Sequence, residues 1–389
     1  MKEFASYFEP IDIERLRSAV KPRSLFFETK FNGEEGLPEL DDCQIAIIGI
    51  QEGRNCEDNR GCEHGAMSIR QELYSLYRSD HRLNLVDLGN LKNGKEISDT
   101  IAAISTITGE LIKRKIVPVF IGGPQFATFG IYKAFAAIEK AVNITSIDPK
   151  LDLGLLDTEL KSDSYLSRII MGEPSYLFNY INLGYQTYLT EPHQIKLMDR
   201  MHFETYRLGE IAQNIPDTEP LLRTSDIVSF DMSAIRMSDN PANHRALPNG
   251  LYGEQACQMM RYAGLNENLK ALGIFEYNPA FDLRGQSAQL IAEMIWCFAE
   301  ALISRVKDIP KMSKNNFLQY KVNVKDQTNI TFYKSKLTDR WWMEVPYPAK
   351  KNESYKKNEL IPCTYQEYES ASEAEIPLRW WKSFQRLSN

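Results

Sequence analysis

The stretch "IVPVFIGGPQF", residues 116–126, decides the fold. Its first six residues form a continuous run without polar alternation, which is typical of a strand buried on both faces of a parallel sheet. Two glycines and a proline then end the strand. The residues that follow, "FATFGIYKAFAAIEKA" at 126–141, have the apolar spacing of a helix. A buried strand followed at once by a helix predicts an α/β unit.

The same pattern recurs along the chain. Seven further runs of strand length are closed by turn or small polar residues. These expected strands are residues 43–50, 83–88, 143–147, 176–183, 202–208, 226–230 and 271–275. Further expected helices cover residues 65–77, 97–114, 252–264 and 286–306. The alternation predicts an α/β domain with a largely parallel sheet of about eight strands.

The composition indicates a soluble globular protein. Of 389 residues, 43% are hydrophobic and 25% are charged, and the net charge is −6, so binding to nucleic acid or to a membrane surface is not expected. No apolar run reaches the ~18 residues of a membrane span. The first residues are polar and acidic rather than signal-like, so we expect the cytoplasm.

The six cysteines are too scattered for a disulfide framework. Three residues, Cys56, Cys62 and His64, lie close enough in the sequence to suggest zinc. A tetrahedral zinc site needs a fourth ligand, so the simpler interpretation is a reduced loop.

Polar side chains follow four of the expected strands. In open α/β sheets, ligands bind beyond the carboxyl ends of the strands. The residues at these ends are Gln125, Asp148, Lys150, Asp152, Asp231, Ser233, Arg236, Glu276, Asn278 and Asp282. Any one aspartate at a strand end also caps turns and helices, but the set together favours a site.

These residues carry a resemblance to a known family. The segments "GGPQ" (122–125), "DPKLD" (148–152), "SFDMS" (229–233) and "EYNP" (276–279) occur in this order. The segments "NRGCEHGAMSIRQEL" (59–73), "LGYQTYL" (183–189) and "PNGLYGEQA" (248–256) agree with them. The chain resembles the ureohydrolase family of arginase, agmatinase and formimidoylglutamase over roughly residues 40–308, and is most similar to formimidoylglutamase-like members.

The resemblance implies a three-layer α/β fold and a two-manganese site, where a metal-bridging hydroxide attacks a guanidinium or formimino carbon. The family's ligands, two histidines and four aspartates, fall on Gln125, Asp148, Lys150, Asp152, Asp231 and Ser233. Only the three aspartates are kept, and a charged lysine cannot ligate a metal. We therefore expect no metal or other cofactor. If manganese binds, Asp148, Asp152 and Asp231 would hold it.

Lys150 is expected to replace the charge of a metal, with its ammonium within salt-bridge distance of the neighbouring aspartates. The alternative is a catalytic lysine, but two adjacent carboxylates raise its pKa instead of lowering it. The candidates for contacting a substrate are Glu276, Asn278, Asp282 and Arg236. Hydrogen bonding within the strand-end loops is an equal alternative for Glu276 and Asp282.

Residues 311–389 lie outside the resemblance, so we divide the chain into an α/β domain, 1–310, and a C-terminal extension, 311–389. The extension carries 14 Lys and Arg against 9 Asp and Glu, and four of the five tryptophans. Its pattern predicts two or three short strands and one short helix, with Thr364 and Glu367 in capping-box spacing.

The extension contains "DRWW" (339–342) and "LRWW" (378–381). Such aromatic and arginine clusters are typical of interaction hot spots. The candidate partner-binding residues are Arg340, Trp341, Trp342, Arg379, Trp380 and Trp381. The alternative is that the tryptophans fold back onto the core.

Three hypotheses follow for the function. The first is a ureohydrolase-fold protein without catalysis that binds a protein partner through the extension. The second is an active amidinohydrolase on a formimino or guanidino substrate, with a degenerate manganese site. The third and weakest is a nucleic-acid-associated module. The resemblance also implies a homo-oligomer, since the family often forms trimers or hexamers.

Overall fold

The computed structural model describes residues 2–17, 20–56, 58–80, 83–156, 159–310, 314–324, 328–347 and 357–388. Within them, ten strands form one large sheet with the order β1-β4-β3-β5-β10-β9-β6-β7-β8, and β2 pairs with β4. The strands are β1 (Phe8–Glu9), β2 (Thr29–Phe31), β3 (Ile45–Ile50), β4 (Leu85–Leu91), β5 (Val117–Ile121), β6 (Val142–Ile147), β7 (Leu177–Tyr185), β8 (Glu204–Arg207), β9 (Ile227–Asp231) and β10 (Ala271–Phe275).

All eight strands expected from the sequence are present, as β3 to β10. They pair in parallel, and β1 alone of the described strands in this sheet runs antiparallel to its neighbour, β4. The sequence missed β1 and β2, which are only 2 and 3 residues long. Runs this short carry no readable period.

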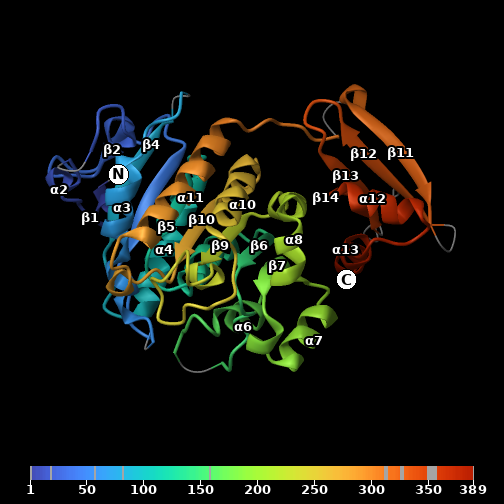
Figure 1. Cartoon of the computed structure of the whole chain (residues 1–389), viewed down its shortest axis with the longest axis horizontal. Helices are drawn as coiled ribbons and strands as arrows, with labels where there is room; N and C mark the ends of the chain where they lie inside the picture. The colour runs from blue at the N-terminus through green and yellow to red at the C-terminus, as the bar shows by residue number, and fades with distance from the viewer. Residues whose placement is uncertain are drawn as a thin grey trace.

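Helices cover both faces of the sheet (Figure 1). They are α1 (Lys2–Ala5), α2 (Ile13–Arg17), α3 (Gly65–Ser75), α4 (Ile97–Lys113), α5 (Ala127–Ala136), α6 (Tyr165–Ile170), α7 (Pro192–Arg200), α8 (Leu208–Gln213), α9 (Thr218–Leu222), α10 (Gly253–Leu265) and α11 (Gln286–Ile303). In the described parts of the chain, no helix has both the length and the apolar character to cross a membrane.

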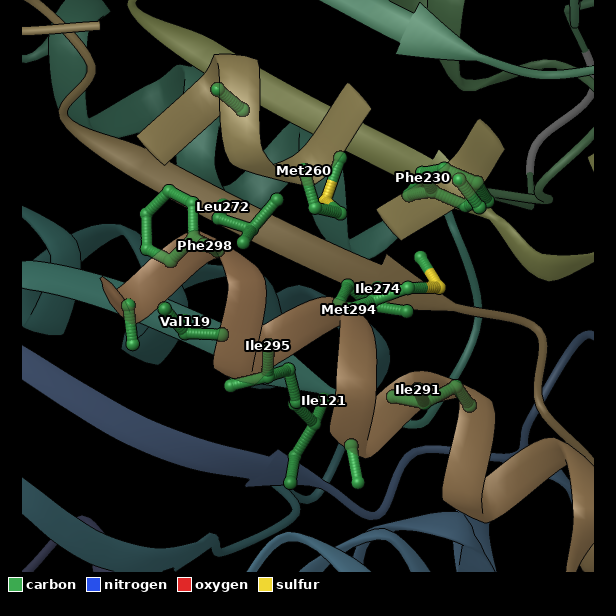
Figure 2. Packing of buried hydrophobic residues seen from close by; sticks show 14 of the residues in the cluster. Val119, Ile121, Phe230, Met260, Leu272, Ile274, Ile291, Met294, Ile295 and Phe298 are labelled. Carbon is green, nitrogen blue, oxygen red and sulfur yellow. The ribbon is translucent and has the colours of Figure 1, made fainter. Parts of the chain in front are cut away.

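The alternation of side chains along each strand builds a separate core on each face. On β5, Val119 and Ile121 belong to the core under α3, α10 and α11, whereas Phe120 belongs to the core under α4 and α5. Figure 2 shows Ile295 and Phe298 of α11 packed over the β5 and β10 side chains. Both faces of the strands are buried, which confirms the three-layer α/β architecture.

The C-terminal extension forms its own antiparallel sheet of order β11-β12-β13-β14. Its elements are β11 (Phe317–Asn323), β12 (Asn329–Ser335), β13 (Trp341–Tyr347), β14 (Lys357–Cys363), α12 (Tyr365–Ser372) and α13 (Leu378–Ser388). The expected capping box opens α12, where the Glu367 N–H donates to Thr364 Oγ1 over 3.1 Å. The two or three strands expected from the alternation at 317–345 are present as β11, β12 and β13, whereas β14 and α13 were not predicted.

The two "RWW" copies adopt different structures. In the first copy, Trp341 and Trp342 begin strand β13, and in the second, Trp380 and Trp381 lie in helix α13. Helix α13 was not predicted from the sequence. Their surroundings, not the shared letters, determine the local structure.

The extension packs beside strand β8 of the large sheet and beside helix α7. Helix α13 provides the main contact, since Arg379 Nε lies 2.8 Å from Glu204 Oε2 and Lys382 Nζ donates to the Phe203 carbonyl over 2.7 Å. Arg223, just after α9, stacks over the Trp342 ring with 4.5 Å from Cζ to the ring centroid. The extension is therefore joined to the α/β domain through buried charged and aromatic contacts.

Candidate functional site

Four neighbouring strands, β5, β10, β9 and β6, end at one edge of the large sheet. Because they run in parallel, the residues after them converge on one pocket. This pocket has a volume of about 460 Å³. Its lining includes Lys150, Asp152, Asp231, Ser233 and Glu276 from the residues predicted at the strand ends.

Gln125 is fully buried behind the pocket. Gly122 and Gly123 make the turn before it with φ values of 72° and 70°, which favour glycine. The Gln125 Nε2 donates to Ser146 Oγ over 3.1 Å, and its backbone N–H donates to Glu276 Oε1 over 2.9 Å. Its amide also lies within hydrogen-bonding reach of Asp148, whose pKa it lowers. Gln125 thus serves as an internal hydrogen-bonding residue.

Asp152 lines the pocket, and the buried Asp148 lies next to it. Burial raises the pKa of Asp152 well above its usual value, and the Asp148 carboxylate raises it further. Burial also raises the pKa of Asp148, although a hydrogen bond with Asp152 lowers it. The Oδ2 atoms of both residues are buried and have no hydrogen-bond partner. The raised pKa values of the two neighbouring carboxyl groups favour the retention of a proton by the pair.

Lys150 lies half-buried between these aspartates in the sequence and lines the pocket. Its backbone N–H donates to Asp148 Oδ1 over 2.7 Å. Its ammonium lowers the pKa of both aspartates from a distance, but the ion pairs of the described residues do not include Lys150. The ion pair expected from the sequence is therefore not formed.

Asp231 ends strand β9 and faces the same pocket. Burial raises its pKa well above the usual value, and the charges of Asp148 and Glu276 add to this effect. Its Oδ1 accepts the Ser233 N–H over 2.6 Å. Ser233 is buried beside it and adds no charge. The base of the pocket is thus rich in carboxyl groups and poor in close cations.

Hydrogen bonds hold the Glu276 carboxylate of the pocket in one position. Its backbone has a φ of 64°, which is uncommon outside glycine. Its carboxylate accepts three hydrogen bonds, from Asn59 Nδ2 (2.9 Å), Ser162 Oγ (2.7 Å) and the Gln125 N–H (2.9 Å). Neutral donors from three distant segments hold this charge in place.

The sequence did not identify several residues of the pocket. Asn59 and Ser162 hold Glu276, Asn243 donates to the Glu276 carbonyl over 2.8 Å, and Arg245 pairs with Asp58 at the mouth. Of these, only Asn59 lay in a segment that carried the family resemblance. The others come from loops whose position depends on the complete fold.

The other proposed substrate contacts lie elsewhere. Asn278 caps the short turn η6 (Pro279–Phe281), where its Oδ1 accepts the Ala280 N–H over 3.0 Å. Asp282 accepts the N–H groups of the first turn of α11, including Ala288 over 2.9 Å. Arg236 lines a different cavity. None of the three lines this pocket.

A metal centre of the usual kind is not evident among the described residues, where no group of three or more His, Cys, Asp or Glu is placed to hold an ion. The sequence alternative of zinc at Cys56, Cys62 and His64 has no support from the arrangement. Cys62 is fully buried, whereas 73% of the His64 side chain is exposed.

The candidate partner-binding residues of the extension divide into two groups. Trp341, Trp342, Trp380 and Arg379 are buried, and Arg340 pairs with Glu219 of the α/β domain over 3.1 Å. Trp381 alone of the six is substantially exposed, at 45%. The expected contact surface is therefore reduced to Trp381, because the other five residues contact the chain itself.

Comparisons with known proteins agree with this geometry. The family model described as the arginase family matches residues 43–300. Formimidoylglutamase of Photorhabdus laumondii is 23% identical over 282 residues, which are 67% of this chain and 87% of the relative. The Vibrio cholerae formimidoylglutamase is 24% identical over 294 residues, covering 68% of this chain and 86% of the relative.

Solved structures show the same fold. Trypanosoma cruzi formiminoglutamase, crystallised with Mn²⁺, superposes with a TM-score of 0.64 at 18% identity and covers 69% of this chain and 96% of its own. Formimidoylglutamase from Bacillus subtilis superposes with a TM-score of 0.62 at 18% identity and covers 68% and 88%. The extension lies beyond the residues that the family model matches.

Proposed function

Because the chain belongs to the arginase family, with the fold of its formimidoylglutamase-like members, we propose that it binds a ligand or partner without the family's metal-dependent hydrolysis. The proposal concerns only the chemistry of the pocket, since the family and the fold are established. It also sets this chain apart from relatives that are named as enzymes.

The donor set does not fit a pair of manganese ions. The six positions that correspond to metal ligands hold three carboxyl groups, an amide, a hydroxyl and an ammonium. Two divalent cations need about four carboxylates for charge balance and favour imidazole or carboxylate donors. Lys150 has no lone pair to offer while charged. We therefore derive no hydrolytic step through a metal.

One observation carries the proposal: the hydrogen bonding around Asp148. The Asp152 carboxyl and the Gln125 amide both lie within hydrogen-bonding reach of Asp148, and the Lys150 N–H donates to it. A backbone N–H and the nearby amide thus stabilise part of this carboxylate without a metal, while its Oδ2 has no hydrogen-bond partner and can accept one from a ligand. The pocket is then a preformed polar cavity that recognises a ligand by its hydrogen bonds and charge.

A second candidate function rests on the same region. Asp148 Oδ2, Asp152 Oδ2 and Gln125 Oε1 are three buried oxygens that lack a hydrogen-bond partner in the structure. Oxygens of this kind are the donors that Mg²⁺, Ca²⁺ and Mn²⁺ prefer. This favours an amidinohydrolase with a single, degenerate manganese site, acting on a formimino or guanidino compound.

Metal content separates the two candidates. The full-length chain is purified in manganese, and the metal per chain is measured together with formamide and urea release from formiminoglutamate, arginine and agmatine. We expect much less than one manganese per chain and no release above background. Stoichiometric manganese that disappears in Asp231→Asn but stays in Asp163→Asn, an exposed aspartate of the same pocket, would favour the enzyme.

A gain-of-function series tests whether the changed donor residues explain the proposed loss of manganese binding. The triple change Gln125→His, Lys150→His and Ser233→Asp restores the family's ligand types, and we expect it to bind manganese. Lys150→His alone should not, because Gln125 and Ser233 remain. Equal manganese binding by the single variant and the triple variant would contradict this account of the donor set.

We also propose that the extension contributes a contact for a protein partner, centred on Trp381. This ring stacks on Phe384 with 6.2 Å between ring centroids, which holds an exposed aromatic in a fixed place. A crosslinking comparison of the parent chain with Trp381→Ser tests it. Loss of one specific crosslinked product in Trp381→Ser, but not in Tyr252→Ser, is expected. Sedimentation of the same samples measures self-association, since a second copy is one partner of this kind.

A further inference from the structure

A second cavity, of about 400 Å³, lies next to the pocket. The segment around the short turn η3 (Thr187–Leu189) separates the two, because Leu189 lines the pocket whereas Tyr188 lines the second cavity. Likewise, Leu247 lines the pocket and Pro248 lines the second cavity. None of the six positions that correspond to metal ligands lines the second cavity. It is a separate space with its own chemistry.

The charged groups that line the second cavity are all positive. They are the guanidinium groups of Arg207 and Arg236, and no aspartate or glutamate is among the lining residues. Arg207 is exposed, and its Nε donates to the Tyr185 hydroxyl over 3.4 Å. Arg207 is also absent from the ion pairs of the described residues. Glu210, whose carboxylate accepts the Arg207 backbone N–H over 3.2 Å, is a nearby negative charge but forms no ion pair with the guanidinium. The exposed guanidinium can therefore meet an anion.

Arg236 is held more rigidly. Its guanidinium carbon lies 3.6 Å from the centroid of the Tyr252 ring, and its Nε lies 2.9 Å from Asp239 Oδ1. Asp239 is itself fixed, since its Oδ2 accepts the Gly253 N–H over 2.9 Å. A guanidinium that is stacked on a ring and anchored by a carboxylate loses little entropy when it binds a ligand.

Aromatic rings form the walls of the second cavity. Tyr188 is 69% exposed, yet its hydroxyl is held in place because it accepts from Asn249 Nδ2 over 3.3 Å and donates to Gln186 Oε1. Gln186 Nε2 in turn donates to the Asn249 carbonyl over 3.1 Å. Tyr252 adds a second ring, which is 42% exposed. A fixed, exposed ring offers its face for stacking at low entropic cost.

We propose that the second cavity binds a small aromatic anion, namely a flat heteroaromatic ring that carries a phosphate or carboxylate group. Guanidinium groups bind both anions with paired hydrogen bonds, and the tyrosine rings stack on the flat part. The volume lies within the range of small-molecule sites. This inference is independent of the proposed function, because the second cavity does not include the family's ligand positions.

Calorimetric titration of the full-length chain tests the proposal. The probes are adenosine monophosphate, indole-3-acetate, adenosine and inorganic phosphate. We expect saturable binding of adenosine monophosphate or indole-3-acetate at one site per chain, with adenosine and phosphate weaker by about tenfold or more. The two anionic probes distinguish a phosphate ligand from a carboxylate ligand. The proposal is overturned if neither of them saturates, or if adenosine binds equally well.

Variants locate the binding. Arg207→Gln and Tyr188→Ala should each weaken the better probe by about fivefold or more, since one removes the free charge and the other a stacking face. Arg200→Gln, an exposed arginine on α7 outside the lining, is the matched control and should bind like the parent. Glu276→Gln should also leave binding unchanged. If Glu276→Gln abolishes binding while Arg207→Gln does not, the probe occupies the first pocket and the proposal is wrong.

Discussion

Two sets of buried carboxylates on the large sheet, Glu204 at the interface and the aspartates of the pocket, have pKa values that move in opposite directions. Burial raises the pKa of Glu204, but Arg379 and Arg386 of the extension bring it down to about 2. Burial also raises the pKa of Asp152 in the pocket, and the Asp148 carboxylate raises it further. The difference is the presence of a close cation. At the interface, arginines of the same chain neutralise the carboxylate. In the pocket, a proton or a ligand has to neutralise the carboxylates.

This contrast separates a region built for stability from one suited to binding. At the interface, the Glu204 carboxylate accepts four hydrogen bonds, from Arg379, Arg386, Asn179 Nδ2 and the Tyr206 hydroxyl. All four donors belong to the chain, so no ligand is needed to satisfy this carboxylate. In the pocket, Asp148 and Asp152 keep oxygens without partners. Perturbed carboxyl groups in a cavity are typical of functional sites, because they are retained despite their cost to stability.

The largest expected effect comes from breaking the interface. Glu204→Gln leaves Arg386 buried without a countercharge and Arg379 with Glu367 alone, at 3.4 Å. Removal of one partner from a buried ion pair typically costs ~3–5 kcal/mol. We expect a loss of this size in the free energy of unfolding at pH 7, measured with urea. The folded pKa of Glu204 lies below its ordinary value, so its stabilisation is full above pH ~4.3. It is lost as the pH falls toward 2, and the gap between the parent and the variant should close over this range.

An exposed ion pair provides the control for this prediction. Glu110 pairs with Lys113 over 2.8 Å on the surface of α4. Glu110→Gln should cost less than ~0.5 kcal/mol, because solvent screens exposed pairs. If Glu204→Gln costs no more than Glu110→Gln, the interface is not held by its charges and the contrast with the pocket fails.

The second prediction is a gain in the free energy of unfolding, for a substitution at Asp152. Asp152 holds its proton in the folded chain above its ordinary pKa of ~3.9, so stability falls as the pH rises through the raised value. In Asp152→Asn the new side chain is neutral at every pH. The backbone φ of 50° at this position suits asparagine, which tolerates the left-handed region. We expect the variant to be more stable than the parent at pH 8, with the gain vanishing toward pH 4.

Denaturation in the presence of a chelator measures this gain without bound metal. Asp163→Asn, at an exposed position of the same pocket, is the control and should show no comparable dependence on pH. A flat difference between Asp152→Asn and the parent from pH 4 to 8 would mean that Asp152 titrates normally. Manganese that stabilises the parent but not Asp152→Asn would instead support the enzyme.

The sequence predicted the sheet better than it predicted the site. Runs such as 116–121 are local patterns typical of strands buried on both faces, so the eight main strands were identified. The strand ends also correctly placed Asp152, Asp231 and Glu276 in one pocket. The partners of these residues could not be predicted, because they lie far away in the chain. Ser162 reaches Glu276 across 114 positions, and Arg379 reaches Glu204 across 175.

The extension shows the same limit more strongly. Its tryptophans were equally compatible with a partner surface and with a core, since burial depends on which face of an element meets the rest of the molecule. In α13, Trp380 is 4% exposed and the adjacent Trp381 is 45% exposed. One position along a helix turns a side chain by ~100°, so neighbouring residues of one type can have opposite environments.

The smallest effect, and the sharpest test of the comparison, concerns Lys150. The sequence predicted a buried ion pair here, whose loss would cost ~3–5 kcal/mol. In the structure Lys150 is half-buried, forms no ion pair with the described residues and acts on Asp148 and Asp152 only from a distance. Lys150→Ala should therefore change the free energy of unfolding by no more than ~0.5 kcal/mol at pH 7, as for an ordinary surface position. The change should shrink below pH 4, where the aspartates are protonated in both the folded and the unfolded chain. A loss of 2 kcal/mol or more would mean that Lys150 enters the pocket and neutralises its carboxylates. The pocket would then resemble the Glu204 interface, with its cation supplied by the chain, and the proposed need for a proton or a ligand would disappear.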